Sequence, residues 1–385
     1  MTELQILPLD GLHQRLGGKM VPFAGYSMPV QFPMGVKGEH LQVRTKAGLF
    51  DVSHMGQAYL SLSDGVGSDD AHKAIAALIE ELVPGEIQKL GKARIRYTVL
   101  LDENGGILDD LMVTRLPTDE DAGRLFLVVN AAVKDQDFAL INEKLAGRAT
   151  LEVLEDRCLL ALQGPTAHTI IDSLFPGAGE IPFMSLMHAD YEGEAIMISR
   201  CGYTGEDGYE LSVPAGKAEA LAEKLLAHAD VEPIGLGARD SLRLEAGLCL
   251  YGHDMTPAET PVEASLVFAM GKRRREEGGF PGAARIQQQL RDGVAKRRVG
   301  IKPLGRAPAR EGVEIQSPDG EVIGTVTSGG FGPSYEGPVA MGYVKSAFAD
   351  TGTKVHLIVR GKPQEAEVAD LPFVEQRYYR GKKSV

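Results

Sequence analysis

Residues 97–114, YTVLLDENGGILDDLMVT, are the segment from which the fold of this chain is most clearly inferred. The apolar runs on either side of the turn signal DENGG predict a β-hairpin. Side chains alternate across a strand, so Asp109 and Asp110 must point to opposite faces. Three apolar residues share the face of Asp109: Ile107, Leu111 and Val113. We therefore expect the Asp109 carboxylate to lie in a largely apolar wall.

Strands and helices alternate on the C-terminal side of this hairpin. LFLVV, residues 125–129, predicts another strand, and a second hairpin joins EAIMISR, residues 194–200, to YELSV, residues 209–213. Helical spacing predicts helices at residues 133–147, 216–229 and 238–248. Hairpins with intervening helices favour an α+β fold over a doubly wound parallel sheet.

The composition changes sharply at residues 271–283, GKRRREEGGFPGA, which we interpret as a linker between domains. Beyond this segment the chain shows little helical periodicity. Strand-like segments separated by Gly and Pro turns follow at residues 297–303, 320–328, 339–344 and 354–359. This pattern predicts a C-terminal β-barrel or sandwich, which we place at residues 285–385.

The overall composition restricts the class of protein. The chain has 385 residues, enough for two or three domains, and its 43% hydrophobic and 24% charged content is typical of a soluble globular protein. A net charge of −12 argues against nucleic-acid binding, and no apolar run reaches the roughly 18 residues of a membrane span. The N-terminus resembles neither a secretory signal nor a transit peptide. We expect a cytoplasmic protein, or a mitochondrial-matrix protein if an organellar presequence has been removed.

Common catalytic and metal-binding patterns are absent from the sequence. The cysteines Cys158, Cys201 and Cys249 lie far apart, and no CxxC or Cys/His cluster indicates a disulfide framework or a zinc site. The sequence contains no P-loop, no dinucleotide-binding fingerprint, no GxSxG elbow and no HExxH helix. We therefore expect no metal site and no nucleotide, flavin or serine-nucleophile mechanism.

Nine segments, found in the same order, resemble the T-protein family of the glycine cleavage system, whose members are aminomethyltransferases. Together they span nearly the whole chain: GGKMVPFAGYSMPVQF (17–32), LFDVSHM (49–55), GGILDDLMV (105–113), LALQGPTA (160–167), RCGYTGEDGYELSVP (200–214), LGARDSLRLEAGLCLYG (236–252), GKRRR (271–275), GTVTSGGFGPS (324–334) and PFVEQRYY (372–379). Any one of them alone would be weak evidence, whereas nine in family order make a chance similarity improbable.

This resemblance implies a fold and a reaction. The family has a three-lobed α+β folate-binding fold with a C-terminal β-barrel, so residues 1–275 would form two intertwined lobes, the second at roughly 56–150. Family members take the aminomethyl group from the dihydrolipoyl arm of the H-protein, release ammonia and pass the methylene carbon to tetrahydrofolate, giving 5,10-methylenetetrahydrofolate. The implied partners are the lipoylated H-protein and tetrahydrofolate, which is a substrate rather than a bound cofactor.

The resemblance also implies site residues. Asp109, the first aspartate of DDL, matches the catalytic aspartate, acting either as a general base or as a group that only positions the folate. Glu210, Arg239 and Tyr378 match folate-binding residues, and a carboxylate and a guanidinium suit the polar edges of a pterin and its glutamate tail. Five further residues are matched to positions near the ligand: Met55, Tyr97, Val113, Asn130 and Tyr203.

Most of these residues also have a purely structural interpretation. Asp110 is interpreted as a solvent-facing turn residue. Glu210 would otherwise be a solvent-facing strand residue, and Arg239 would otherwise form an ion pair on a helix surface. Asn130 is also a natural N-cap for a helix that begins near residue 131. Tyr97 and Tyr378 would otherwise be packing residues.

The basic run Lys272, Arg273, Arg274 and Arg275 is typical of a solvated linker. Within the resemblance, however, it has an acidic carrier protein and the glutamate tail of folate as possible partners. We expect it to dock the H-protein through long-range, salt-sensitive attraction. Glu276 and Glu277 follow at once and weaken the local positive field.

Two other functions fit this family resemblance. The first is the folate-accepting module of a demethylase, but such proteins carry a flavin domain that this sequence lacks. The second is a non-catalytic folate-binding relative, which resembles KGC-Y-x-G-Q-E around the glycine loop. Residues 200–206 read RCGYTGE here, which favours the transferase.

Overall fold

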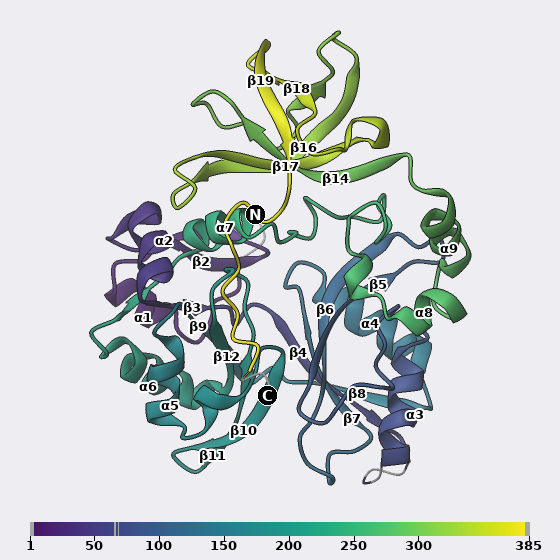
Figure 1. Ribbon diagram of the computed structural model, residues 1–385. Helices are drawn as coiled ribbons and strands as arrows, with labels where there is room; N and C mark the ends of the chain where they lie inside the picture. Colours follow the sequence, from purple (N-terminus) through teal and green to yellow (C-terminus); the bar gives the residue numbers. More distant parts are fainter. Residues whose placement is uncertain (1–3, 65–66, 68, 382–385) are drawn as a thin grey trace.

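The computed structural model describes residues 4–64, 67 and 69–381, which form two α/β bodies with a β-barrel above them (Figure 1). The first body contains a six-stranded sheet in the order β10-β11-β12-β9-β3-β13. Its strands are β3 (Ala47–Asp51), β9 (Arg157–Gln163), β10 (Ser185–Tyr191), β11 (Glu194–Arg200), β12 (Gly208–Pro214) and β13 (Val231–Pro233). A two-stranded sheet, β1 (Lys19–Phe23) with β2 (Tyr26–Gln31), belongs to the same body. The predicted hairpin of EAIMISR and YELSV is confirmed, since β11 pairs antiparallel with β12.

Apolar helix faces cover both sides of the six-stranded sheet. One core joins the sheet to α1 (Asp10–Arg15), α5 (Ala167–Leu174) and α6 (Ala215–Leu226). A second core, on the opposite face, joins it to α2 (Gly35–Thr45) and α7 (Leu236–Glu245). The sheet is therefore buried on both sides, with the short 3-10 helix η1 (Ala178–Glu180) packed beside α5.

The second body is inserted between two strands of the first sheet, because the chain leaves at β3 and returns at β9. Its five-stranded sheet has the order β5-β6-β7-β4-β8. The strands are β4 (Gly56–Leu62), β5 (Ile95–Leu101), β6 (Ile107–Arg115), β7 (Arg124–Val129) and β8 (Ala149–Val153), and the helices are α3 (Asp69–Ile79) and α4 (Lys134–Leu145). The predicted 97–114 hairpin is confirmed as β5 and β6.

The faces of β6 have different surroundings. Leu111 and Val113 pack with α3 and α4 in one core, so this face is covered by helices. Met112, on the other face, packs in a core that contains Leu186 and Met197 of the first body. The side of β6 that carries Asp110 therefore faces the first body, and the side that carries Asp109 faces the helices.

The C-terminal strands close into a six-stranded barrel, which confirms the predicted β-rich domain. They are β14 (Lys296–Pro303), β15 (Glu314–Gln316), β16 (Val322–Gly332), β17 (Gly337–Lys345), β18 (Lys354–Val359) and β19 (Lys362–Ala369), with η3 (Ser346–Phe348) between β17 and β18. A closed barrel has no unpaired edges, which suits a small all-β unit. No helix among the described residues is long and apolar enough to cross a membrane.

The segment predicted to link the two domains is largely helical. It forms α8 (Lys272–Glu277) and is followed by α9 (Ala283–Asp292), with η2 (Val267–Ala269) just before it. Arg273 makes ion pairs of 2.6 Å with Glu80 and 3.1 Å with Glu86, which tie α8 to the second body. These acidic partners are almost two hundred residues away in the sequence, so the local composition could not predict the ion pairs of α8.

The C-terminal tail, residues 370–381, returns from the barrel across the first body (Figure 1). The backbone N–H of Phe373 donates to the carbonyl of Glu245 at the end of α7 (2.9 Å). Further along, the N–H of Arg377 donates to the carbonyl of Gly205, and the carbonyl of Tyr379 accepts from Phe183. The tail thus reaches the glycine-rich loop before β12.

Gly164, at the end of β9, offers a test of this fold. Its φ is +133°, and a Cβ there would lie 2.2 Å from the carbonyl oxygen of Lys46. Gly177 also has a positive φ (+92°), but a Cβ there would meet nothing within 4 Å. We expect Gly164→Ala to lower the free energy of unfolding by about 3 kcal/mol or more, and Gly177→Ala by only about 1 kcal/mol. Urea unfolding of both variants measures this difference, and equal effects would contradict it.

Candidate active site

The two neighbouring aspartates of β6 have different environments. Asp109 has no exposed surface, and its carboxylate accepts hydrogen bonds from the backbone N–H of Asn130 (3.0 Å) and from the Asn130 side-chain amide (2.9 Å). Asp137 of α4 is in hydrogen-bond contact with the same carboxylate. A ligand therefore has no access to Asp109 in this structure.

Asp110 is half-buried on the opposite face of the strand, and the prediction of a solvent-facing turn residue is wrong. Its Oδ1 accepts a hydrogen bond from the Asn130 amide (2.7 Å), and Tyr97 is a second hydrogen-bond partner. Burial and the neighbouring charge of Asp109 raise the pKa of Asp110 to about 8. Asp110 is therefore an acid that exchanges a proton close to neutral pH.

Asn130 joins the two aspartates rather than capping a helix. Its side-chain amide donates to both carboxylates, and α4 begins only at Lys134. The N-cap residue of α4 is Val133, which has no side-chain cap. The proposed N-cap role of Asn130 is thus wrong, while its position beside the aspartates agrees with a place in the site.

Asp137 is a member of this cluster that the sequence analysis missed. It is only 2% exposed, and burial together with the charge of Asp109 raises its pKa to about 10. A sequence signal was available, because Asp137, Ile141 and Leu145 share the apolar stripe of α4. An acid on such a stripe requires a partner inside the protein.

The residues that face Asp110 across the proposed site belong to the first body. The Arg239 guanidinium of α7 lies over the Tyr203 ring, 4.7 Å from its centroid, and forms no ion pair with any residue of the described ranges. Burial raises the pKa of Tyr203, whose phenol donates to the carbonyl of Cys249. The charges of Asp110 and Arg239 also act on this phenol, so Tyr203 lies near both.

Glu210 of β12 also belongs to the first body. Its carboxylate accepts a hydrogen bond from the Cys201 thiol at 3.4 Å, and burial raises its pKa although the charge of Arg239 lowers it. Glu210 is half-buried, not solvent-facing on an open strand. Tyr378 of the tail stacks on Phe183 with ring centroids 4.0 Å apart, and burial raises its pKa to about 12.

The remaining predicted residues divide into two groups. Tyr97 is half-buried beside Asp110 and stacks on Phe268, whose side chain is 68% exposed. Met55 is also half-buried and packs against the core below α2 and α7. Val113 is different, because it is fully buried among α3 and α4 and offers no surface to a ligand. Its folate contact stays a prediction, which this buried side chain does not support because it shares the face of Asp109.

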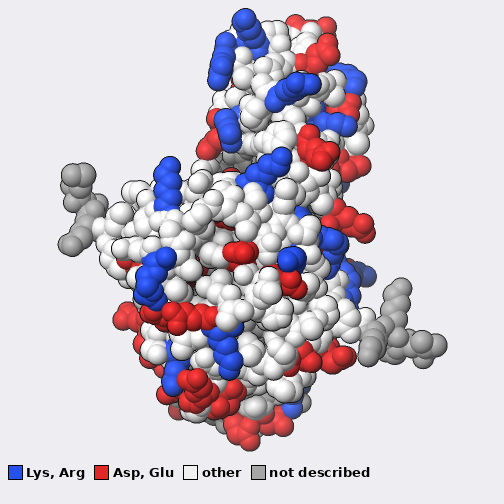
Figure 2. Space-filling view, turned by 90° about the vertical axis from the view of Figure 1, so that its left-hand side faces the viewer, with Lys and Arg blue, Asp and Glu red and all other residues white. Residues whose placement is uncertain are grey.

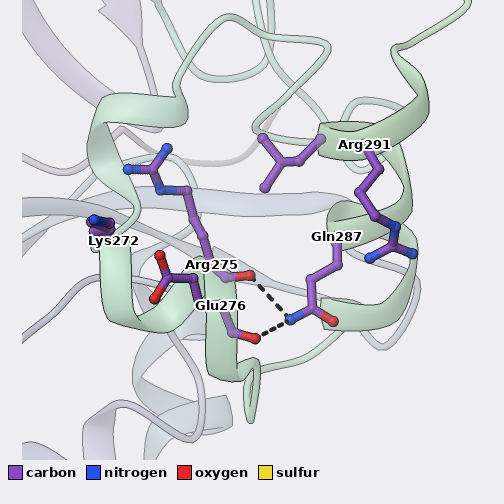
Figure 3. A pocket seen from close by; sticks show the side chains of 6 residues that line it. Lys272, Arg275, Glu276, Gln287 and Arg291 are labelled. Atoms are coloured by element: carbon purple, nitrogen blue, oxygen red, sulfur yellow. Dashed lines mark hydrogen bonds between the residues drawn. The ribbon is translucent and has the colours of Figure 1, made fainter.

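The basic run contributes only part of its charge to the surface. Arg273 is paired with Glu80, Glu86 and Glu277, and Arg274 is buried with its guanidinium donating to the carbonyls of Glu80 and Gly279. The other two cations, Lys272 and Arg275, line a pocket between α8 and α9 (Figure 3). The other lining residues are Glu276, Gln287, Leu290 and Arg291. The Gln287 amide holds the two helices together by donating to the carbonyls of Arg275 and Glu276, both at 3.0 Å.

Charge elsewhere on the protein is mixed. On the face shown in Figure 2, Lys and Arg side chains lie among Asp and Glu side chains from the barrel to the base of the molecule. That face therefore presents no extended basic surface of the kind that binds nucleic acid. Within the described ranges, no group of three or more His, Cys, Asp and Glu residues has the arrangement of a metal site.

Comparison with known proteins assigns both parts of the chain. Residues 9–274 match the model of the GCVT N-terminal domain, and residues 296–375 match that of the glycine cleavage T-protein C-terminal barrel domain. The chain is 45% identical to the mitochondrial aminomethyltransferase of Dictyostelium discoideum, with 98% of this chain and 94% of that protein covered. It is 43% identical to the mitochondrial aminomethyltransferase of Pisum sativum, covering 98% and 91%.

A solved structure agrees with these matches. The glycine cleavage system aminomethyltransferase T of Bartonella henselae superposes with a TM-score of 0.88 at 46% identity, covering 98% of this chain and 99% of that one. The predicted fold, with its C-terminal barrel, is thereby confirmed.

The pKa of Asp110 generates a stability prediction. An acid whose pKa is about 8 in the folded protein holds a proton that the unfolded chain has lost above about pH 4, so the folded state loses stability as pH rises between these values. We expect Asp110→Asn to remove this loss and to stabilise the protein by about 1–3 kcal/mol more at about pH 9 than at about pH 5. Unfolding at both pH values measures it, with exposed Asp319→Asn as the control that should show no pH-dependent gain. A gain that is the same at both pH values would contradict the raised pKa.

Proposed function

Because the chain belongs to the glycine cleavage T-protein family, we propose that the residues around Asp110 bind tetrahydrofolate and the aminomethyl group of a lipoylated H-protein. The protein is an aminomethyltransferase of the glycine cleavage system, a tetrahydrofolate-dependent enzyme. The observation that carries the proposed site is the half-buried Asp110, which faces Tyr97, Tyr203 and the first body. The relatives of Dictyostelium discoideum and Pisum sativum are named mitochondrial, and for this protein a cytoplasmic or mitochondrial-matrix location stays a prediction.

The reaction balances without an oxidant or a reductant. The carbon of the S–CH₂–NH₂ group loses its bonds to sulfur and to nitrogen and gains bonds to N5 and N10 of tetrahydrofolate. The two protons that leave N5 and N10 equal those gained by the thiol and by the departing ammonia. The enzyme must therefore move protons between nitrogens and sulfur at one small site. A general acid–base group can carry out these proton transfers.

Asp110, rather than Asp109, suits this work. It is the aspartate with accessible surface, and its pKa of about 8 allows it to give a proton to leaving ammonia and to take one from a folate nitrogen at neutral pH. Its ionised form would also stabilise the positive charge of an iminium-like transition state. Asp109 is screened from the site by its own strand, so we assign it a positioning role in place of the catalytic one.

Glu210, Arg239 and Tyr378 are proposed to hold the folate. The Arg239 guanidinium has no ion-pair partner in the described structure, and the Glu210 carboxylate has only a weak thiol donor. A pterin offers adjacent N–H donors that a carboxylate accepts, and a folate carries carbonyl and carboxylate groups that a guanidinium binds. Tyr378 would bring the C-terminal tail into the same site.

Substitution of each aspartate in turn distinguishes their roles by the effect on turnover. Purified protein is incubated with tetrahydrofolate and aminomethyl-loaded H-protein, and methylenetetrahydrofolate and ammonia are followed together. We expect Asp110→Asn to lower kcat by on the order of 10²-fold or more and Asp109→Asn by about tenfold. A larger loss at Asp109 would return the catalytic role to that residue. No turnover by the wild type, with folate still bound, would favour a non-catalytic folate binder.

The pocket between α8 and α9 is proposed to dock the H-protein. Lys272, Arg275 and Arg291 bring three cations to one rim, whereas Arg273 and Arg274 are engaged inside the protein. Attraction to an acidic carrier would act through the exposed cations and would weaken with salt. The docking role predicted for the whole run is thus restricted to Lys272 and Arg275, joined by Arg291.

Charge reversal tests this docking surface. We expect the double variant Lys272→Glu, Arg275→Glu to raise the KM for loaded H-protein by about fivefold to tenfold at low salt, with a smaller effect at high salt and an unchanged KM for tetrahydrofolate. Arg360→Glu with Lys362→Glu, both exposed at the far end of the barrel, is the matched control. An unchanged KM for the carrier would exclude this pocket as the docking surface.

A further inference from the structure

Three carboxyl groups meet around one amide in the second body. The Asn130 side chain donates to Asp109 (2.9 Å) and to Asp110 (2.7 Å), and Asp137 is in contact with Asp109 from the helical side. Asp109 has no exposed surface and Asp137 is 2% exposed. The cluster therefore runs from the interior, at Asp137, to the proposed site, at Asp110.

No cation of the described residues neutralises these acids. None of the ion pairs formed by the described residues includes any of the three carboxylates. Lys134, one turn before Asp137 on α4, directs its ammonium to the Tyr26 hydroxyl (2.6 Å) and the carbonyl of His54 (3.2 Å). The other titratable groups of the described residues that face the cluster are the phenols of Tyr97, Tyr203 and Tyr251 and the thiol of Cys249.

Two carboxylates in contact cannot both be ionised without a cation, so the pair of Asp109 and Asp137 must share a proton. The hydrogen bonds show which residue carries it. Asp109 already accepts two N–H donors, an arrangement that favours its ionised form. The Oδ2 of Asp137 is buried and accepts no hydrogen bond from an N–H or hydroxyl group of the described residues. The proton therefore belongs to Asp137.

We infer that Asp137 is a positioning residue of the transferase: as a neutral carboxylic acid it donates a hydrogen bond to Asp109 and thereby holds Asn130 and Asp110 in place. The raised pKa of Asp137, about 10, is consistent with this state at neutral pH. The catalytic consequence rests on the proposed function of Asp110, whereas the protonation state does not. Asp137 acts through Asp109 and Asn130 and does not contact the substrates.

The test compares a variant that keeps the donor with one that removes it. The amide of Asp137→Asn can donate to Asp109 as the acid does, so we expect kcat within about threefold of wild type and an unshifted pH–rate profile. Asp137→Ala leaves Asp109 without this donor, and kcat should fall about tenfold or more while the KM for tetrahydrofolate changes little. Asp135→Ala, at an exposed position of the same helix, is the control.

The opposite results are equally specific. If Asp137 were ionised in the working enzyme, Asp137→Asn would remove a negative charge near Asp110, lower its pKa and shift the alkaline limb of the profile to lower pH. That shift, or an Asp137→Ala variant as active as wild type, would overturn the inference. So would an Asp137→Asn variant that is as impaired as Asp137→Ala.

Infrared spectroscopy supplies a readout that requires neither turnover nor the alanine variant. A neutral carboxylic acid has a C=O stretching band that carboxylates lack, and we expect wild-type protein at neutral pH to lose such a band on Asp137→Asn substitution. Absence of any difference would overturn the inference. A wild-type protein that shows the band but forms no methylenetetrahydrofolate would instead count against the proposed function alone.

Discussion

The carboxylate of Glu245, at the end of α7, has no exposed surface and accepts hydrogen bonds from distant parts of the chain. Its donors are His40 (3.1 Å) and Arg44 (2.9 Å) of α2 and the backbone N–H groups of Ser334 (2.8 Å) and Tyr335 (3.0 Å) between β16 and β17. Burial alone would raise the pKa of Glu245, but these donors outweigh it and the pKa is lowered. One ionised side chain thus fixes the barrel to the first body.

The position of the C-terminal tail depends on the same contacts. The carbonyl of Glu245 accepts from Phe373, and Arg44 binds Glu206, which in turn pairs with Arg377 of the tail (2.6 Å). This path brings Tyr378 against Phe183 and near Cys201, whose thiol donates to Glu210. The proposed folate residues come from the first body and the tail, and the acids come from the second body. Their mutual placement therefore requires all the bodies to be held at fixed positions. A buried charge network achieves this because its hydrogen bonds are directional as well as strong.

Much of this could be predicted from the sequence, and the failures have a common physical cause. Alternation along β6 correctly separated Asp109 from Asp110, but it could not say which side faces the site, because both sides are covered. The apolar neighbours of Asp109 indicated a buried wall, and that wall is made by α3 and α4, against which Val113 also packs. The basic run was interpreted from its own composition, while Glu80 and Glu86, which neutralise Arg273, lie far away in the sequence. Local patterns define elements and faces; long-range partners decide which face or charge is free.

Two clusters of buried carboxylates in this protein are stabilised in opposite ways. Glu245 is surrounded by cations and backbone donors that lower its pKa, so it remains ionised, and Glu206 pairs with Arg44 and Arg377. The three aspartates around Asn130 form no ion pair with a cation of the described residues, so Asp110 and Asp137 have raised pKa values and ionising them is costly. A cluster kept only for stability would be better served by apolar residues of similar size. Its retention beside the most accessible of the three acids is explained if that acid must exchange a proton near neutral pH, since a neighbouring cation would lower the pKa of Asp110 and leave it a permanent anion.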